Sequence, residues 1–227
     1  MEEFRMNYPI PHLESILLLG AIIFPLGFGS NLSLLFGKHN SGSLREGLLG
    51  TVGAYVIIVA LVLMIQPAAI LDFHAPTSFW WYIAAPLIGI ACIGLEYLVG
   101  MGILYLKTGT LVTRAGVHHT YTGPSKISFF DVLFIVLFVI GEELLLRQML
   151  YRILANDFEL AIGLVIAVCV LVYALNHVTF GVQSMIGKLF SGFVYVMVYQ
   201  LAGLAVIIPI LAHITQNLSL LTLARRK

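Results

Sequence analysis

Long apolar stretches constrain this chain more than any other feature of its sequence. Those at 48–70, 80–106 and 159–178 have the length of ~20 residues that a helix needs to cross a lipid bilayer. Charged residues make up only 10% of the chain, against about 25% in a soluble domain, and mean hydropathy is +1.00. This composition excludes an ordinary soluble domain, a disordered chain and a basic protein that binds nucleic acid. It predicts an integral membrane protein that contacts the lipid bilayer.

Short polar connectors divide the sequence into predicted helices. The apolar segments cover approximately 10–36, 48–70, 80–106, 128–154, 159–178, 186–201 and 203–223. We therefore expect an all-α fold, a polytopic transmembrane helical bundle of about seven spans. Residues 1–127 would contain the N-terminal transmembrane helices and loops, and residues 128–227 a helical core that carries the polar motifs, within a single membrane domain.

Basic residues predict the orientation of these helices, because cytoplasmic loops are enriched in Lys and Arg. If the N-terminus lies outside, Arg5 is the basic residue of the outer segments. The inner segments would then contain Lys38, Arg45, Lys107, Arg114, Lys126, Lys188, Arg225, Arg226 and Lys227. This asymmetry predicts a multi-pass protein of the plasma membrane with a cytoplasmic C-terminus.

Helix 128–154 carries ionisable residues that an isolated membrane helix would exclude. The segment Gly141-Glu-Glu-Leu-Leu-Leu-Arg147 places charges among apolar residues, at roughly 2.5–3.5 kcal/mol each on insertion scales. Glu143 and Arg147 share a helix face and can pair, whereas Glu142 points about 100° away from Glu143. We expect Glu142 to be a reactive carboxylate that the Glu143–Arg147 pair supports. The motif alone also allows a purely structural ion-pair network.

Two further polar pairs lie in later apolar helices. Tyr173 and His177 share a face of helix 159–178, and His213 and Asn217 share a face of the last helix. A carboxylate, an imidazole and a water molecule form a general-base set, while an imidazole and an amide suit an oxyanion hole. A histidine in a membrane helix often only hydrogen-bonds a neighbouring helix, and this structural role is the alternative.

A shared site for Glu142 and His177 poses a geometric problem. Their helices form a hairpin whose turn is predicted near 155–158. Glu142 would then lie closer to the turn than His177 does, by a depth on the order of 9 Å at ~1.5 Å per residue. Tilt, a kink or a displaced turn must remove this mismatch.

The three motifs occur in an order that is typical of one protease family. Residues Glu142–Arg147, Tyr173–His177 and His213–Asn217 resemble the motifs Glu-Glu-x-x-x-Arg, aromatic-x-x-x-His and His-x-x-x-Asn/Asp of the CPBP intramembrane proteases. This is the CAAX protease and bacteriocin-processing family, which includes the type II CAAX prenyl endopeptidase. The resemblance covers about residues 128–223. The chain differs at Gln148, where the family often has Gly.

This resemblance implies a glutamate-type intramembrane endopeptidase, a peptide hydrolase that acts on a membrane-associated protein or peptide. The implied catalytic residues are Glu142, His177, His213 and Asn217. The implied supporting residues are Glu143, Arg147 and Tyr173. The first glutamate and the first histidine would activate a water molecule, and the second histidine and the asparagine would stabilise the oxyanion. Neither a cofactor nor a metal is expected.

Two alternatives remain open from the residues themselves. Two histidines and a glutamate are a known catalytic zinc ligand set, so a zinc-dependent version of the same protease is one alternative. Against it, the sequence lacks a His-Glu-x-x-His motif. The other alternative is a catalytically inactive membrane scaffold or binding protein, in which the polar clusters serve only helix packing.

Overall fold

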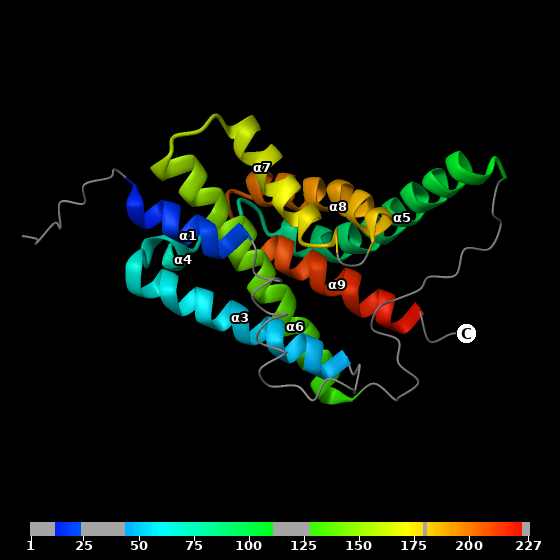
Figure 1. Ribbon diagram of the computed structural model, residues 1–227, viewed down its shortest axis with the longest axis horizontal. Coiled ribbons are helices and arrows are strands. Elements are labelled where there is room, and N and C mark those ends of the chain that lie inside the picture. Colours follow the sequence, from blue (N-terminus) through cyan, green and yellow to red (C-terminus); the bar gives the residue numbers. More distant parts are fainter. Residues whose placement is uncertain (1–11, 24–43, 111–127, 179–180, 224–227) are drawn as a thin grey trace, which may run out of the picture.

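The computed structural model describes residues 12–23, 44–110, 128–178 and 181–223, and its helices are shown in Figure 1. The α-helices are α1 (Leu13–Ile23), α3 (Leu44–Ile65), α4 (Ala68–Leu71), α5 (Trp80–Thr108), α6 (Phe129–Glu143), α7 (Ile162–Leu175), α8 (Val182–Leu201) and α9 (Ile207–Leu223). Two π-helical segments, η1 (Leu144–Leu150) and η2 (Ile153–Asp157), follow α6. The predicted all-α class is confirmed over these residues.

A helix occurs in each predicted range, although several helix ends differ from the prediction. Residues 24–36 of the first predicted helix lie outside the described residues, as do most of the basic residues that predict the orientation. Among the described helices, α5 and α8 are long enough and apolar enough to cross a membrane, fewer than the seven spans expected. Shorter apolar helices are α1, α7, α9 and residues 50–65 of α3.

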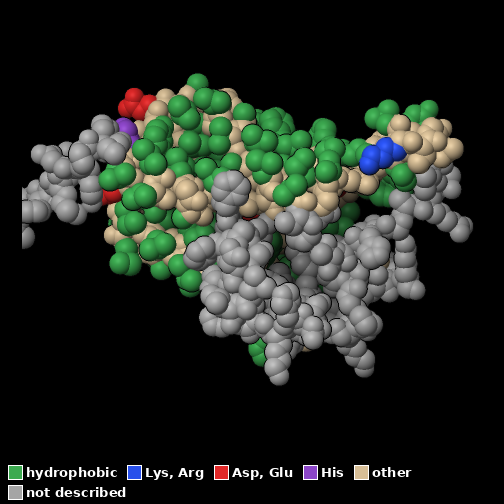
Figure 2. Space-filling view, viewed as in Figure 1, with side chains coloured by type: hydrophobic (Ala, Val, Ile, Leu, Met, Phe, Trp, Pro, Cys, Tyr) green, Lys and Arg blue, Asp and Glu red, His purple; other side chains and the backbone are tan. Residues whose placement is uncertain are grey.

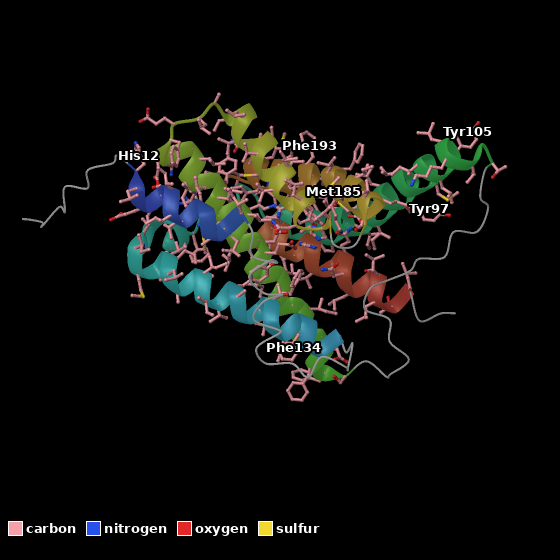
Figure 3. The ribbon with its side chains drawn as sticks, viewed as in Figure 1. His12, Tyr97, Tyr105, Phe134, Met185 and Phe193 are labelled. Atoms are coloured by element: carbon pink, nitrogen blue, oxygen red, sulfur yellow. The ribbon has the colours of Figure 1, made fainter. Side chains whose placement is uncertain are left out.

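The outer surface of the described residues is mostly apolar. Hydrophobic side chains cover most of the described part of the face shown in Figure 2. Large apolar side chains are exposed, with Met64 at 81% and Leu106 at 84%. In Figure 3, Tyr97 and Tyr105 lie on the part of α5 that extends beyond the other helices. An apolar surface of this extent is typical of contact with lipid.

Helix α9 joins the helices that carry the polar motifs. It packs along α5 and contacts α6 and α8, while α7 packs against α8 and against η1. The Glu-Glu-x-x-x-Arg segment at the α6–η1 junction therefore lies against both helices that carry histidine motifs. Helix α3 packs on α6.

Two glycines allow close helix contacts next to motif residues. A Cβ atom on Gly89 of α5 would lie 2.1 Å from the carbonyl oxygen of Ala212 in α9, the residue before His213. A Cβ atom on Gly192 of α8 would lie 2.5 Å from Cδ1 of Tyr173. Larger residues at these positions would displace α9 from α5 and the tyrosine ring from α8.

The turn between α6 and α7 differs from the prediction, and the difference removes the expected depth mismatch. The predicted turn at 155–158 is wrong: η2 continues to Asp157, and α7 begins only at Ile162. The backbone N–H of Phe158 bonds the carbonyl of Ile153 at 3.2 Å, so the helical path is prolonged by π-type hydrogen bonds. Glu142 consequently lies as many residues before the 158–161 connector as His177 lies after it.

The connection between α8 and α9 confirms the predicted break between helices 186–201 and 203–223. Gly203 and Leu204 have positive φ angles of 80° and 63°, a conformation that ends a helix and favours glycine. The N–H of Thr77 donates to the carbonyl of Ala202 at 3.1 Å. The α4–α5 connector is thereby attached to this turn, and α9 starts later than residue 203.

The same connector is attached to the π-helical region through Asp72. The Gln148 side chain donates to the Asp72 carbonyl at 2.8 Å and accepts from the Tyr199 hydroxyl at 3.2 Å. The Arg152 guanidinium pairs with the Asp72 carboxylate. Gln148, at which the chain differs from the motif that it resembles, therefore contributes a structural contact.

We expect Asp72→Asn to lower the thermal unfolding temperature at neutral pH. The hydrogen bond and charge of Arg152 hold the pKa of the Asp72 carboxyl below its ordinary value. A lowered folded-state pKa means that this stabilisation is present above the unfolded pKa, ~3.9, and is lost as pH falls through the folded pKa. Melting curves in detergent should therefore converge for variant and wild type in strong acid.

The control is Glu159→Gln at an exposed carboxylate, whose melting should follow wild type both at pH 7 and in strong acid. Unchanged melting of Asp72→Asn at pH 7 would contradict the prediction.

Candidate active site

The Glu-Glu-x-x-x-Arg segment is almost completely buried. Glu142 and Glu143 are the last residues of α6, and Arg147 lies in η1. Their side chains are 2%, 0% and 1% exposed. The Arg147 Nε atom lies 3.2 Å from Glu143 Oε2, as the helical spacing predicts. The guanidinium also stacks over the Tyr173 ring, 4.4 Å from its centroid, which places a cation against an aromatic face.

Glu142 lies between the two predicted histidines. Its Oε1 atom is 4.0 Å from His177 Nε2, and its Oε2 atom is 3.8 Å from His213 Nδ1. The three residues come from α6, from the end of α7 and from α9, and they are far apart in the sequence. The structure therefore brings together three of the four residues predicted to be catalytic.

The His177 ring is oriented by the end of its own helix. Its Nδ1 atom lies 2.8 Å from the backbone carbonyl of Tyr173, and the two rings are 4.8 Å apart between centroids. Because a carbonyl oxygen can only accept, Nδ1 carries the hydrogen in this contact. In neutral His177, Nε2 is then a hydrogen-bond acceptor on the side of Glu142.

His213 makes a contact that the sequence interpretation did not include. Its Nδ1 atom lies 2.7 Å from Glu143 Oε1, so Glu143 has two partners, His213 and Arg147. The His213 ring stacks on Tyr195 with centroids 5.1 Å apart and an interplanar angle of 27°. The Tyr195 hydroxyl donates to Gln216, and both of these residues are buried.

Asn217 follows His213 by one turn of α9 and is buried. Gln216 could have been suspected from the sequence, because a polar residue inside an apolar helix is a functional candidate. Tyr195 gave no such signal, because a tyrosine in an apolar helix is indistinguishable from a core residue.

A second ion pair lies between α5 and α8. The Lys188 Nζ atom is 2.8 Å from Glu96 Oε1, with side chains 12% and 20% exposed. Lys188 thus neutralises the Glu96 carboxylate within the bundle. Because Lys188 is paired inside the bundle, its position is weaker evidence for which side of the membrane is cytoplasmic.

The polar cluster of the described residues does not have the geometry of a metal site. Within the ranges that the structure describes, no group of three or more His, Cys, Asp or Glu side chains has an arrangement that could hold a metal ion. His213 Nδ1 is already engaged by Glu143. Independence from metal remains a prediction.

The C-terminal part of the chain matches a known protein family. Residues 124–219 match a family model described as Rce1-like, type II CAAX prenyl endopeptidase Rce1-like. This segment of the chain is similar to the Rce1-like family. The match confirms the family resemblance predicted for 128–223, and the Rce1-like segment contains all seven predicted catalytic and supporting residues. No curated protein and no solved structure matches the chain.

Proposed function

We propose that this protein is an intramembrane endopeptidase that hydrolyses a peptide bond in a membrane-associated protein or peptide. The observation that carries the proposal is the position of the Glu142 carboxylate, 4.0 Å from His177 Nε2, within the Rce1-like segment. The family match supports a peptide hydrolase, and the buried Glu–His pair supplies groups that activate water.

In the proposed reaction, one water molecule donates its two hydrogens to Glu142 Oε1 and His177 Nε2. Both atoms can accept, because Glu142 is a carboxylate and the His177 Nδ1 hydrogen is directed at the Tyr173 carbonyl. As the water oxygen attacks the scissile carbonyl carbon, its proton passes to this pair. The C–N bond then breaks, and the same proton is delivered to the leaving amine, so that no covalent acyl-enzyme forms.

His213 and Asn217 are the proposed donors to the oxyanion. Both are buried side chains on α9, one helical turn apart and therefore on the same face. His213 lies close to the proposed base, with Nδ1 3.8 Å from Glu142 Oε2. Donors on a rigid helix stabilise developing negative charge without reorganising during the reaction.

We expect His213→Ala and Asn217→Ala each to lower kcat by about 10²–10³ with a smaller effect on KM, because an oxyanion hole acts mainly in the transition state. Steady-state kinetics on one peptide substrate would measure both constants. Thr215→Ala, a polar residue of the same helix whose hydroxyl bonds the Leu211 carbonyl, is the matched control and should cleave normally. An increase of KM with unchanged kcat would instead assign these residues to ground-state binding.

The proposed setting is a multi-pass bundle of seven spans in the plasma membrane, with the C-terminus in the cytoplasm. The two long apolar helices, the shorter apolar helices and the apolar exterior support it. A single cysteine placed at Val117, in a chain without Cys92 and Cys169, should react with an impermeant reagent only after the cytoplasmic side is exposed. Reaction from the outer side of intact cells would contradict this topology.

The substrate is best sought by the peptides that the protein releases. Membranes containing the wild-type protein and a Glu142→Ala variant would be compared by mass spectrometry, with the same amount of folded protein in each. Peptides released only by wild type would support the endopeptidase and identify its substrate. Equal profiles would support the scaffold alternative, and loss of release with o-phenanthroline, restored by zinc, would support the zinc alternative.

A further inference from the structure

We infer that Glu143 holds His213 with hydrogens on both ring nitrogens, so that His213 serves the reaction as a cationic donor through Nε2. The inference rests on the proposed function for its catalytic meaning. It assigns Glu143 a positioning role beyond its ion pair with Arg147, and it rests on the contacts of His213 and on the balance of charge around it.

The hydrogen bond at Nδ1 decides what His213 can offer to a substrate. A carboxylate oxygen only accepts, so the 2.7 Å contact with Glu143 Oε1 places a hydrogen on Nδ1. In the neutral ring, Nε2 would then be an acceptor and would repel a developing oxyanion. Only the doubly protonated ring can bond Glu143 and donate from Nε2 as well.

The charges that surround His213 favour this form. The Glu142 and Glu143 carboxylates lie 3.8 Å and 2.7 Å from Nδ1, and Arg147 pairs with Glu143. The neighbouring Lys188 ammonium is engaged by Glu96 at 2.8 Å. With a neutral His213, two buried carboxylates would share one guanidinium. A protonated His213 balances them, which matters because an uncompensated buried charge is costly.

Aromatic side chains hold the His213 ring in this orientation. Tyr195 stacks on one face, and the Tyr173 ring meets it edge-on at 80° with centroids 6.1 Å apart. The Tyr195 hydroxyl donates to Gln216 in α9, so Tyr195 is fixed to the helix that carries His213. A cationic ring against the face of a tyrosine is itself a favourable contact.

Nitrogen NMR of the full-length protein tests the inference without a substrate. The sample is labelled with ¹⁵N-histidine, and the His213 signals are assigned by their loss in His213→Asn. Wild type should show hydrogens on both ring nitrogens of His213, and Glu143→Gln should show only one. The control Glu159→Gln removes an exposed carboxylate of the 158–161 connector and should leave the His213 signals unchanged. A singly protonated His213 in wild type overturns the inference even if Glu143→Gln does not fold.

Kinetics provide the second measurement. Glu143→Gln should lower kcat by about 10²–10³ with little change in KM, the size expected for loss of one oxyanion donor. Normal kcat in a folded Glu143→Gln variant would overturn the inference while leaving the proposed function in place. Absence of cleavage by the wild-type protein would instead overturn the proposed function, and the NMR result would still decide the protonation of His213.

Discussion

Glu142→Gln should abolish most peptide cleavage while the protein still folds and inserts into the membrane. The Glu142 oxygens lie 4.0 Å from His177 Nε2 and 3.8 Å from His213 Nδ1, too far for a direct hydrogen bond. Glutamine keeps the shape of the side chain, but it removes the carboxylate that accepts the proton. General-base catalysis typically contributes about 10²–10⁴ in rate. Initial rates on an identified peptide, with equal amounts of folded protein, would measure the loss.

His177→Ala should cause a loss of similar size, and the double variant should lose little more. Both residues act on the same water molecule in the proposed reaction, and residues that act as a unit have non-additive effects. Glu96→Gln is the control, because Glu96 is a partly buried carboxylate paired with Lys188 and is not used in the reaction. A folded Glu142→Gln variant that cleaves at nearly the wild-type rate would refute the catalytic assignment.

Arg147→Ala should destabilise the fold more than any other single change at the site, by about 3–5 kcal/mol. Arg147 is 1% exposed, and its removal would leave the Glu143 carboxylate, which is fully buried, with His213 as its remaining partner. The stacking of the guanidinium on the Tyr173 ring would be lost as well. Thermal or denaturant unfolding in detergent would measure the effect.

Two further variants separate charge from packing at Arg147. The double variant Glu143→Gln/Arg147→Met removes both buried charges at similar volume and should recover part of the stability, since apolar replacements of buried ion pairs are often tolerated. Lys188→Ala breaks the more exposed pair with Glu96 and should cost less. Equal losses for Lys188→Ala and Arg147→Ala would show that burial does not determine the cost, contrary to this account.

The sequence alone determined the features that depend on local spacing. Long apolar stretches predict helices because each backbone group must be satisfied within its own segment in lipid. The Glu143–Arg147 pair is observed at 3.2 Å because residues four apart on a helix are neighbours whatever the rest of the fold does. The order of the three motifs likewise indicated the family resemblance, and the family match over 124–219 confirms that resemblance.

Tertiary structure alone decided how these local units meet. The Glu143–His213 hydrogen bond joins residues of α6 and α9, and helical periodicity says nothing about which helix a face will contact. The helix continues through η2 to Asp157, so the 158–161 connector lies equally many residues from Glu142 and from His177, which the polar residues of the sequence did not predict. Tyr195 lies in an apolar stretch of α8, and it reaches the site only because α8 packs against α9. This packing stacks the tyrosine on the His213 ring.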